Sequence, residues 1–159
     1  MFAIRRATTA EEFEIARQLF REYRRAISQF GPDICFQSFD RELDVLPEMY
    51  GHPRGALFLA TRSTDGETVG CVGLRALEPG VCEMKRLYVR ESARGHGLGR
   101  HLVDALLAEA RKLGYNRMRL DTLEPMTAAR ALYASLGFRE IPPYNEHPVN
   151  GTSFLELTL

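Results

Sequence analysis

The sequence predicts a mixed α/β domain rather than a regular succession of strand–helix–strand units. The middle of the chain, residues 56–89, contains three strand-like apolar runs joined by short turns, which is typical of an antiparallel meander. Amphipathic helical patterns stand on both sides of this region. After it, helix and strand alternate twice and a further strand closes the chain.

The N-terminal part predicts a short strand and a long helix. Residues 2–4 form the strand-like run, and Thr8 and Thr9, each with a glutamate three residues later, form two overlapping capping boxes. The apolar residues that follow recur at steps of three and four, as on one helical face. They are Phe13, Ala16, Phe20, Tyr23, Ile27 and Phe30. Gly31 and Pro32 end this helix.

The region that follows predicts a short helix and then the meander. Phe39, Leu43 and Leu46 have the spacing of a helix that breaks before Pro47. The three strands are expected over residues 56–60, 69–77 and 81–89, with turns at 63–66 and 78–80. Alternation of apolar and polar residues fails near Lys85 and Arg86, which predicts a β-bulge there.

From Gly97 onward the period of the apolar residues is helical. The stripe consists of Leu98, Leu102, Leu106, Ala110 and Leu113. Gly114 marks the end of this helix. The remaining elements are a strand around Met118 and Leu120, a helix from Pro125 to Leu136, and closing strands at 138–141 and 154–157.

Length and composition limit the class of protein. The 159 residues, 45% of them apolar, fit one domain that spans residues 1–159. Basic and acidic side chains are equal in number, 21 each, which excludes a protein held on nucleic acid by overall charge. No apolar run approaches the roughly 20 residues of a membrane-spanning helix, and residues 1–6 lack a secretory signal pattern. We expect a soluble, cytoplasmic protein without a nucleic-acid or membrane partner.

The cysteines and histidines do not form a recognisable metal or redox motif. Cys35, Cys71 and Cys82 cannot all pair, and none belongs to a CxxC motif, so neither a disulfide framework nor a zinc site is expected. Cys71 and Cys82 are predicted to be small core residues.

The most informative stretch is a glycine-rich turn between a strand and an amphipathic helix. Gly95, Gly97 and Gly99 alternate with other residues in it, and glycine lets backbone N–H groups approach an oxyanion closely. The N-terminus of the following helix adds unpaired donors and partial positive charge. Arg94 and Arg100, with Arg90 as a further source, would add charge-assisted hydrogen bonds to a diphosphate.

Two common phosphate loops do not fit this turn. A Walker loop ends in Gly-Lys-Ser/Thr, whereas Gly99 is followed by Arg100. A dinucleotide loop reads GxGxxG, whereas the pattern here is GxGxG. A tight turn that holds no ligand is the alternative interpretation.

Two motifs resemble the GNAT superfamily of acetyl-CoA-dependent N-acetyltransferases. Residues 94–99, Arg-Gly-His-Gly-Leu-Gly, are similar to its Q/R-x-x-G-x-G/A signature, and residues 129–138 are similar to its A-x-x-L-Y-x-x-x-G-F motif. Residues 87–89 resemble the family's fourth strand, and the likeness is weakest over residues 28–54. The resemblance implies a mixed central sheet, flanked by helices, whose fourth and fifth strands splay apart.

The resemblance also implies a binding site for acetyl-CoA. Its pantetheine arm would pair with the main chain of Leu87, Tyr88 and Val89 in the gap between the splayed strands. Its diphosphate would lie on the amides of Arg94, Gly95, His96, Gly97, Leu98, Gly99 and Arg100. One position departs from the family, because Met126 stands where an asparagine often contacts the coenzyme, and a thioether is only a weak acceptor. Thr127 is a possible substitute.

Three residues are candidates for the chemistry. Tyr133 occupies the family's tyrosine position and is expected to act as the general acid that protonates the leaving thiolate; a core aromatic is the alternative. Glu83 or Asp121 is expected to act as the general base toward the amine. Either carboxylate could instead be a solvated strand residue or an ion-pair partner.

The expected function is transfer of an acetyl group from acetyl-CoA to a primary amine, by direct attack within a ternary complex. The alternatives are a non-catalytic acetyl-CoA sensor and an acyltransferase that uses a longer acyl-CoA. Residues 28–54 and 142–151 are expected to select the acceptor. A small-molecule amine or amino acid is favoured over a protein N-terminus, and a homodimer is plausible.

Overall fold

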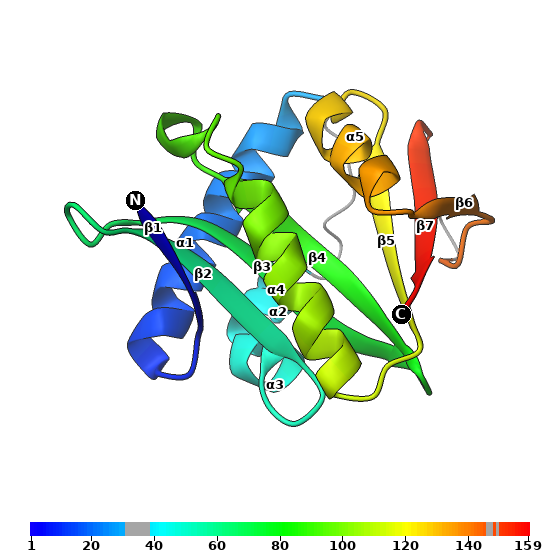
Figure 1. Ribbon diagram of the computed structural model, residues 1–159, viewed down its shortest axis with the longest axis horizontal. Helices are drawn as coiled ribbons and strands as arrows, with labels where there is room; N and C mark the ends of the chain where they lie inside the picture. The colour runs from blue at the N-terminus through cyan, green and yellow to red at the C-terminus, as the bar shows by residue number, and fades with distance from the viewer. Residues whose placement is uncertain (31–38, 146–147, 149) are drawn as a thin grey trace.

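All seven strands of the computed structural model join one sheet, in the order β1-β2-β3-β4-β5-β7-β6 (Figure 1). The structure describes residues 1–30, 39–145, 148 and 150–159. The strands are β1 (Phe2–Arg6), β2 (Ala56–Arg62), β3 (Thr68–Glu78), β4 (Val81–Val89), β5 (Arg117–Leu123), β6 (Arg139–Ile141) and β7 (Thr152–Thr158). Among the strands of the described residues, only the β4–β5 pair is parallel and the other five pairs are antiparallel, so the predicted mixed sheet is confirmed.

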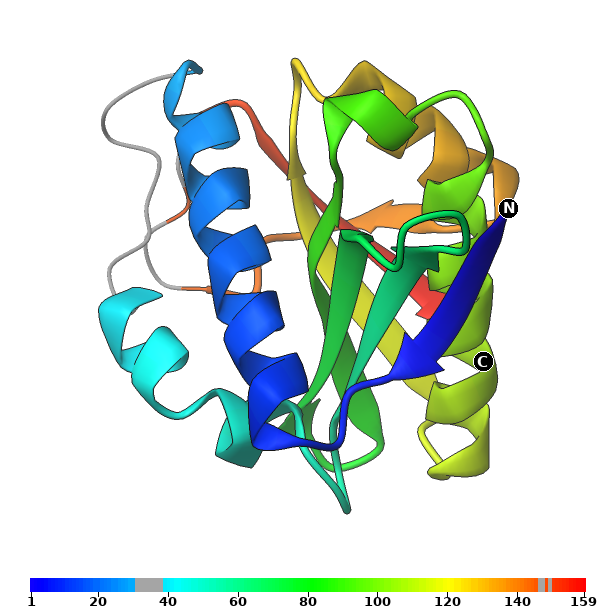
Figure 2. The same ribbon diagram turned by 90° about the vertical axis from the view of Figure 1, so that its left-hand side faces the viewer.

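Helices cover both faces of this sheet (Figure 2). One face carries α1 (Ala10–Ser28), α2 (Phe39–Asp44) and α3 (Leu46–Tyr50), and the other carries α4 (Leu98–Lys112) and α5 (Thr127–Ser135). Each face has its own buried apolar cluster. Leu102 and Leu106 belong to the α4 cluster, and Phe20 and Leu46 belong to the α1 cluster. The sheet is therefore buried on both sides along its central strands.

The first helix begins at the predicted capping box. Thr9 Oγ1 accepts from the Glu12 amide at 3.1 Å, and Glu12 Oε1 accepts from the Thr9 amide at 3.1 Å. The predicted apolar face extended to Phe30, but α1 ends at Ser28 and Phe30 is exposed. The stop signal predicted at residues 31–32 lies outside the described residues.

The meander and its bulge are as predicted. β2, β3 and β4 pair in succession, and the β3–β4 register shifts between Cys71, which is opposite Tyr88, and Gly73, which is opposite Lys85. One residue of β3, Val72, therefore faces two residues of β4, Arg86 and Leu87.

The pairing of β4 with β5 is short. It covers only Val81–Glu83 against Arg117–Arg119, although each strand continues well beyond. The two strands then diverge toward the end of the sheet where α5 lies (Figure 1). The expected splay of the fourth and fifth strands is present.

The two described cysteines are core residues, as predicted. Cys71 and Cys82 are buried free thiols, and burial raises the pKa of Cys82 to about 12, while Cys35 lies outside the described residues. Among the described residues, no group of three or more potential metal ligands occurs. Within the same residues, no helix has both the length and the apolar character needed to cross a bilayer.

Candidate active site between β4, α4 and α5

A cavity of about 490 Å³ lies where β4 and β5 separate. Its walls are the end of α1, the main chain of residues 87–89, the glycine-rich turn and the start of α5. The residues lining it include Leu87, Tyr88, Val89, Arg94, Gly95, Gly97, Leu98, Gly99, Met126, Thr127 and Leu132. The structure thus gathers most of the predicted coenzyme-binding residues around one cavity.

The glycine-rich turn has the backbone conformation that its sequence suggests. Gly95 and Gly97 have φ values of +85° and +72°, which L side chains rarely adopt. Gly97 is the N-cap of α4 and makes no side-chain capping hydrogen bond. The first amides of α4 therefore face the turn without a side-chain acceptor, which leaves donors for an anion.

The edge of β4 that faces the gap presents main-chain groups of Leu87 and Val89. The Arg90 amide donates to the Val69 carbonyl at 2.8 Å, so the main-chain groups of Arg90 face β3. Because the main-chain groups of successive residues alternate in direction in an antiparallel pair, those of Leu87 and Val89 face the gap. Arg94 Nε donates to the Val89 carbonyl at 3.0 Å from the glycine-rich turn.

The other basic side chains near the turn have partners outside it. Arg90 donates to both oxygens of Glu22 at 2.9 and 2.7 Å and to Glu67 at 2.6 Å. Its guanidinium therefore binds Glu22 of α1 in place of the diphosphate contact expected for it. Arg100 is half-exposed and lies 3.6 Å from Asp104. His96 lies with Nδ1 3.2 Å from the Ala93 carbonyl and its ring against Phe2, so its side chain packs against β1.

Tyr133 of α5 is buried and lines a second, small cavity of about 20 Å³. Its ring packs against Phe138 at a centroid distance of 5.7 Å, so it belongs to the core and to the cavity wall at once. Burial raises the pKa of its phenol, and the nearby Tyr23 and Asp121 raise it further. The phenol is therefore protonated at neutral pH.

The two candidate carboxylates have different surroundings. Asp121 is exposed on β5 and lines the small cavity together with Tyr133. Glu83 is buried on β4, where Oε1 accepts from Arg75 Nε at 2.7 Å and Oε2 accepts from the Tyr144 hydroxyl at 2.6 Å. Lys85 Nζ is 4.0 Å from the same Oε1. The structure brings Asp121, but not Glu83, to the cavity of Tyr133.

Met126 stands at the N-cap of α5, between the two cavities. The Thr122 hydroxyl donates to its sulfur at 3.9 Å. Thr127, the first residue of α5, lines the larger cavity and is exposed. Thr127 is thus exposed to the larger cavity directly after Met126, the position at which the sequence departs from the motif it resembles.

Sequence reasoning missed two side chains of α1 and α2 near the site. Tyr23 lines both cavities, and Glu42 of α2 forms a buried ion pair with Arg86 of the bulge. The signal for Arg86 was present, because two successive basic residues interrupt an apolar strand. Nothing in the local sequence identified Glu42 as its partner.

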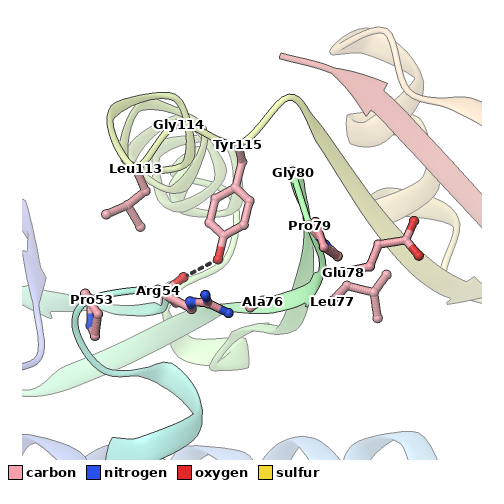
Figure 3. A pocket seen from close by; sticks show the side chains of 10 residues that line it. All are labelled: Pro53, Arg54, Ala76, Leu77, Glu78, Pro79, Gly80, Leu113, Gly114 and Tyr115. Atoms are coloured by element: carbon pink, nitrogen blue, oxygen red, sulfur yellow. Dashed lines mark hydrogen bonds between the residues drawn. The ribbon is translucent and has the colours of Figure 1, made fainter.

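A further cavity of about 480 Å³ lies near the β3–β4 turn and the C-terminal end of α4 (Figure 3). The Tyr115 hydroxyl donates to the Arg54 carbonyl at 2.7 Å across its wall. Its volume matches that of the cavity beside the glycine-rich turn, but its wall contains none of the predicted site residues. The two cavities are similar in volume and differ in the residues that line them.

Comparisons with known proteins identify the family of this chain. The model of the acetyltransferase (GNAT) family matches residues 14–138. An N-acetyltransferase of Schizosaccharomyces pombe is 38% identical, with 94% of this chain and 90% of the relative covered. An IAA acetyltransferase of Azospirillum brasilense is 34% identical over 57% of this chain and 59% of its own length.

Solved structures share the fold. A GNAT acetyltransferase from Staphylococcus aureus has a TM-score of 0.79 at 18% identity, covering 99% of both chains. The ribosomal-protein-S18-alanine N-acetyltransferase of Escherichia coli has a TM-score of 0.69 at 21% identity, covering 99% of this chain and 94% of that one. A GNAT acetyltransferase from Elizabethkingia anophelis, solved with acetyl-CoA bound, has a TM-score of 0.63 at 20% identity, covering 99% and 98%.

The fold and the site define an acyltransferase of the N-acetyltransferase class. The family match spans well over half of the chain, and the yeast relative is similar over nearly its whole length. The chain belongs to the acetyltransferase (GNAT) family.

Proposed function

We propose that this protein transfers an acetyl group from acetyl-CoA to a primary amine by direct attack within a ternary complex. The observation that carries the proposal is the short pairing of β4 with β5. Beyond Glu83 the strands diverge, and a 490 Å³ cavity lined by the end of β4 and the start of α5 reaches the uncapped N-terminus of α4. An elongated thioester with a diphosphate at one end fits a gap of this kind, because strand edge and helix terminus supply matching donors.

Within this proposal the coenzyme is held mainly by main-chain groups. The pantetheine amides pair with Leu87 and Val89, whose main-chain groups face the gap, and the diphosphate lies on the amides of residues 94–100. Arg94 supplies charge beside the turn, and its hydrogen bond to Val89 gives way to the bound pantetheine. Thr127 supplies a hydroxyl near the position of the missing asparagine.

The reaction requires two proton movements. The amine nitrogen forms a bond to the thioester carbonyl carbon while the carbon–sulfur bond breaks, a carboxylate takes a proton from the amine, and Tyr133 donates a proton to the sulfur. Burial raises the pKa of Tyr133, which keeps the phenol protonated but also makes it a weaker acid. Its role as general acid is therefore proposed from its place in the wall of the small cavity.

The site geometry favours Asp121 as the base over Glu83. Asp121 shares the small cavity with Tyr133, so an amine there could reach both groups. Glu83 would first have to give up its hydrogen bond from Arg75 or from Tyr144. We propose Asp121 as the direct base, and Glu83 is the competing candidate that mutation must test.

We propose a small amine or an amino acid as the acceptor. The small cavity, of about 20 Å³, has room for the amine group alone, and Lys85 and Asp121 on its wall offer opposite charges to a zwitterionic amino acid whose other atoms stay outside it. The named relatives differ in acceptor, and one of them acts on a protein alanine. An alanine-initiated peptide therefore belongs in any acceptor panel. We further propose that residues 1–159 act as one domain, because one sheet contains all the described strands.

Calorimetric titration with acetyl-CoA and CoA tests the binding step, and CoA release with amines, amino acids and the peptide tests turnover. We expect binding and CoA release with at least one acceptor. Arg94→Ala should weaken binding, whereas Arg54→Ala, on the wall of the other cavity, is the matched control that should not. Binding without turnover across the panel would favour the sensor, and turnover only with a longer acyl-CoA would favour the second alternative. The absence of any binding would refute the proposal.

A further inference from the structure

The bulge of β4 places a non-glycine residue in a left-handed conformation. Arg86 has a φ of +61°, and among the described residues every other positive φ belongs to a glycine. Such a backbone is disfavoured for L residues with a Cβ atom, so the surrounding structure must hold it in place.

This bulge decides which way the second half of β4 faces. Cys82 and Met84, before the bulge, belong to the apolar cluster under α4, and Leu87 and Val89, after it, pack against the same cluster. In an uninterrupted strand, residues separated by an odd number of positions face opposite sides of the sheet. The extra residue therefore turns Leu87 and Val89 to the α4 side and sets their main-chain groups toward the gap.

The side chain of Arg86 is anchored on the opposite side of the sheet. Its Nε and Nη2 donate to Glu42 Oε2 and Oε1 at 3.0 and 2.9 Å, and only 11% and 7% of the two side chains is exposed. The guanidinium also lies over the ring of Phe39, 5.3 Å from its centroid. Cys71 Sγ is 3.4 Å from the Arg86 carbonyl and fixes the main chain at the same residue.

Two further residues support Glu42 in this position. The Tyr50 hydroxyl donates to Glu42 Oε2 at 3.0 Å. The Tyr50 ring lies against Gly73 of β3, where a Cβ atom would come within 2.6 Å of the ring. Glycine at this one position makes room for the tyrosine, and Gly73 is itself paired with Lys85 beside the bulge.

We propose that Glu42 is a positioning residue for catalysis, which holds Arg86 in its left-handed conformation and so fixes the bulge that aligns Leu87 beside Tyr133. Arg86, Leu87 and Tyr133 line the same small cavity, whereas Glu42 does not line it and acts through Arg86. A buried ion pair adds little net stability over an apolar pair of similar volume. We therefore assign the Glu42–Arg86 pair a role in fixing the backbone conformation at Arg86. The inference rests on the proposed acetyl transfer and adds to it the residue that aligns the reacting end of the thioester.

The test compares kcat with coenzyme affinity in Glu42→Gln, which removes the charge but keeps the volume. We expect kcat to fall at least tenfold while the Kd for CoA rises less than threefold, because the disturbed bulge misplaces Leu87 at the reacting end while the diphosphate stays on the amides of the glycine-rich turn. In the double variant Glu42→Gln/Arg86→Gly, glycine adopts a positive φ freely, so kcat should recover at least threefold over Glu42→Gln. Glu109→Gln is the matched control. It removes the charge with which Glu109 of α4 pairs with Arg6 of β1, and it should keep wild-type kcat.

The outcomes separate this inference from the proposed function. Wild-type kcat in Glu42→Gln, or an equal loss of kcat and of CoA binding in a folded variant, would overturn the inference. If Glu42→Gln does not fold, Tyr50→Phe carries the test, because it removes one hydrogen bond to Glu42 and no charge. A threefold or larger loss of kcat at unchanged CoA affinity then supports the inference, and unchanged kcat overturns it. A wild-type protein that never releases CoA would refute the proposed function itself, and the inference with it.

Discussion

The Tyr144 hydroxyl donates a hydrogen bond to Glu83 Oε2 across 2.6 Å, which joins the connection between β6 and β7 to the middle of β4. The Arg119 guanidinium lies over the Tyr144 ring, 5.6 Å from its centroid, and Phe154 meets the same ring edge-on at 5.1 Å. With Arg75 of β3 on the other oxygen, both carboxylate oxygens of Glu83 accept a hydrogen bond. Glu83 is thus hydrogen-bonded on both oxygens, whereas Asp121 lines the small cavity together with Tyr133.

The first prediction separates the two carboxylates. Asp121→Asn should lower kcat about 100-fold, within the range for loss of a general base. Glu83→Gln and Tyr144→Phe should instead lower the free energy of unfolding by about 1–3 kcal/mol, because a buried polar group loses its partner. Steady-state CoA release and urea unfolding measure the two effects. A greater loss of kcat in Glu83→Gln than in Asp121→Asn, with both variants folded, would assign the base to Glu83.

The second prediction concerns the general acid. Tyr133→Phe removes the phenolic proton and keeps the ring that packs against Phe138, so kcat should fall about 100-fold while the KM for acetyl-CoA stays near that of the wild type. Tyr115→Phe removes a hydroxyl at the other cavity and serves as the control. Unchanged turnover in Tyr133→Phe would leave this tyrosine with a packing role only.

The third prediction tests the glycine-rich turn through its backbone. Gly97→Ala forces a side chain into a φ of +72°, at a cost of about 1–2 kcal/mol, and should raise the Kd for CoA by disturbing the turn. Gly66→Ala imposes the same strain at a φ of +74° in the turn between β2 and β3. Both variants should lose similar stability in urea unfolding, but only Gly97→Ala should lose CoA affinity in calorimetry. Equal Kd values in the two variants would contradict a role for the turn.

The fourth prediction concerns the acid stability of the pair formed by Glu42 and Arg86. Burial opposes ionisation of Glu42, but the hydrogen bonds and the charge of Arg86 outweigh it and lower the pKa of the carboxyl below its ordinary value of 4.5. Because the folded pKa lies below the unfolded one, the stabilisation is fully present above pH 4.5 and is lost as the pH falls through the folded value.

Urea unfolding between about pH 6 and pH 3, a range that brackets the unfolded pKa, measures this loss. The free energy of unfolding should fall less steeply with acid in Glu42→Gln than in the wild type, because the variant has no carboxyl to protonate. Glu140→Gln, at an exposed position of β6, is the control and should keep the wild-type slope. Parallel slopes for Glu42→Gln and the wild type would show that the pair does not titrate in this range.

Local sequence determined the elements and the chemical character of the site. The capping box at Thr9, the helix after Gly97, the meander and the bulge near Arg86 all follow from side-chain period and backbone preference, which are properties of neighbouring residues. The glycine-rich turn and Tyr133 could be singled out for the same reason, because their motifs are contiguous. Their roles in binding and catalysis remain predictions.

Only the tertiary structure decided which distant side chains pair with the residues of the site. Glu42 meets Arg86 across 44 positions of sequence, Tyr144 meets Glu83 across 61, and Glu22 takes Arg90 away from the turn across 68. It also placed β7 between β5 and β6, although β6 comes first in the chain. Contacts of this kind depend on how whole helices and strands pack, and no pattern within one segment encodes which distant side chain will lie opposite it.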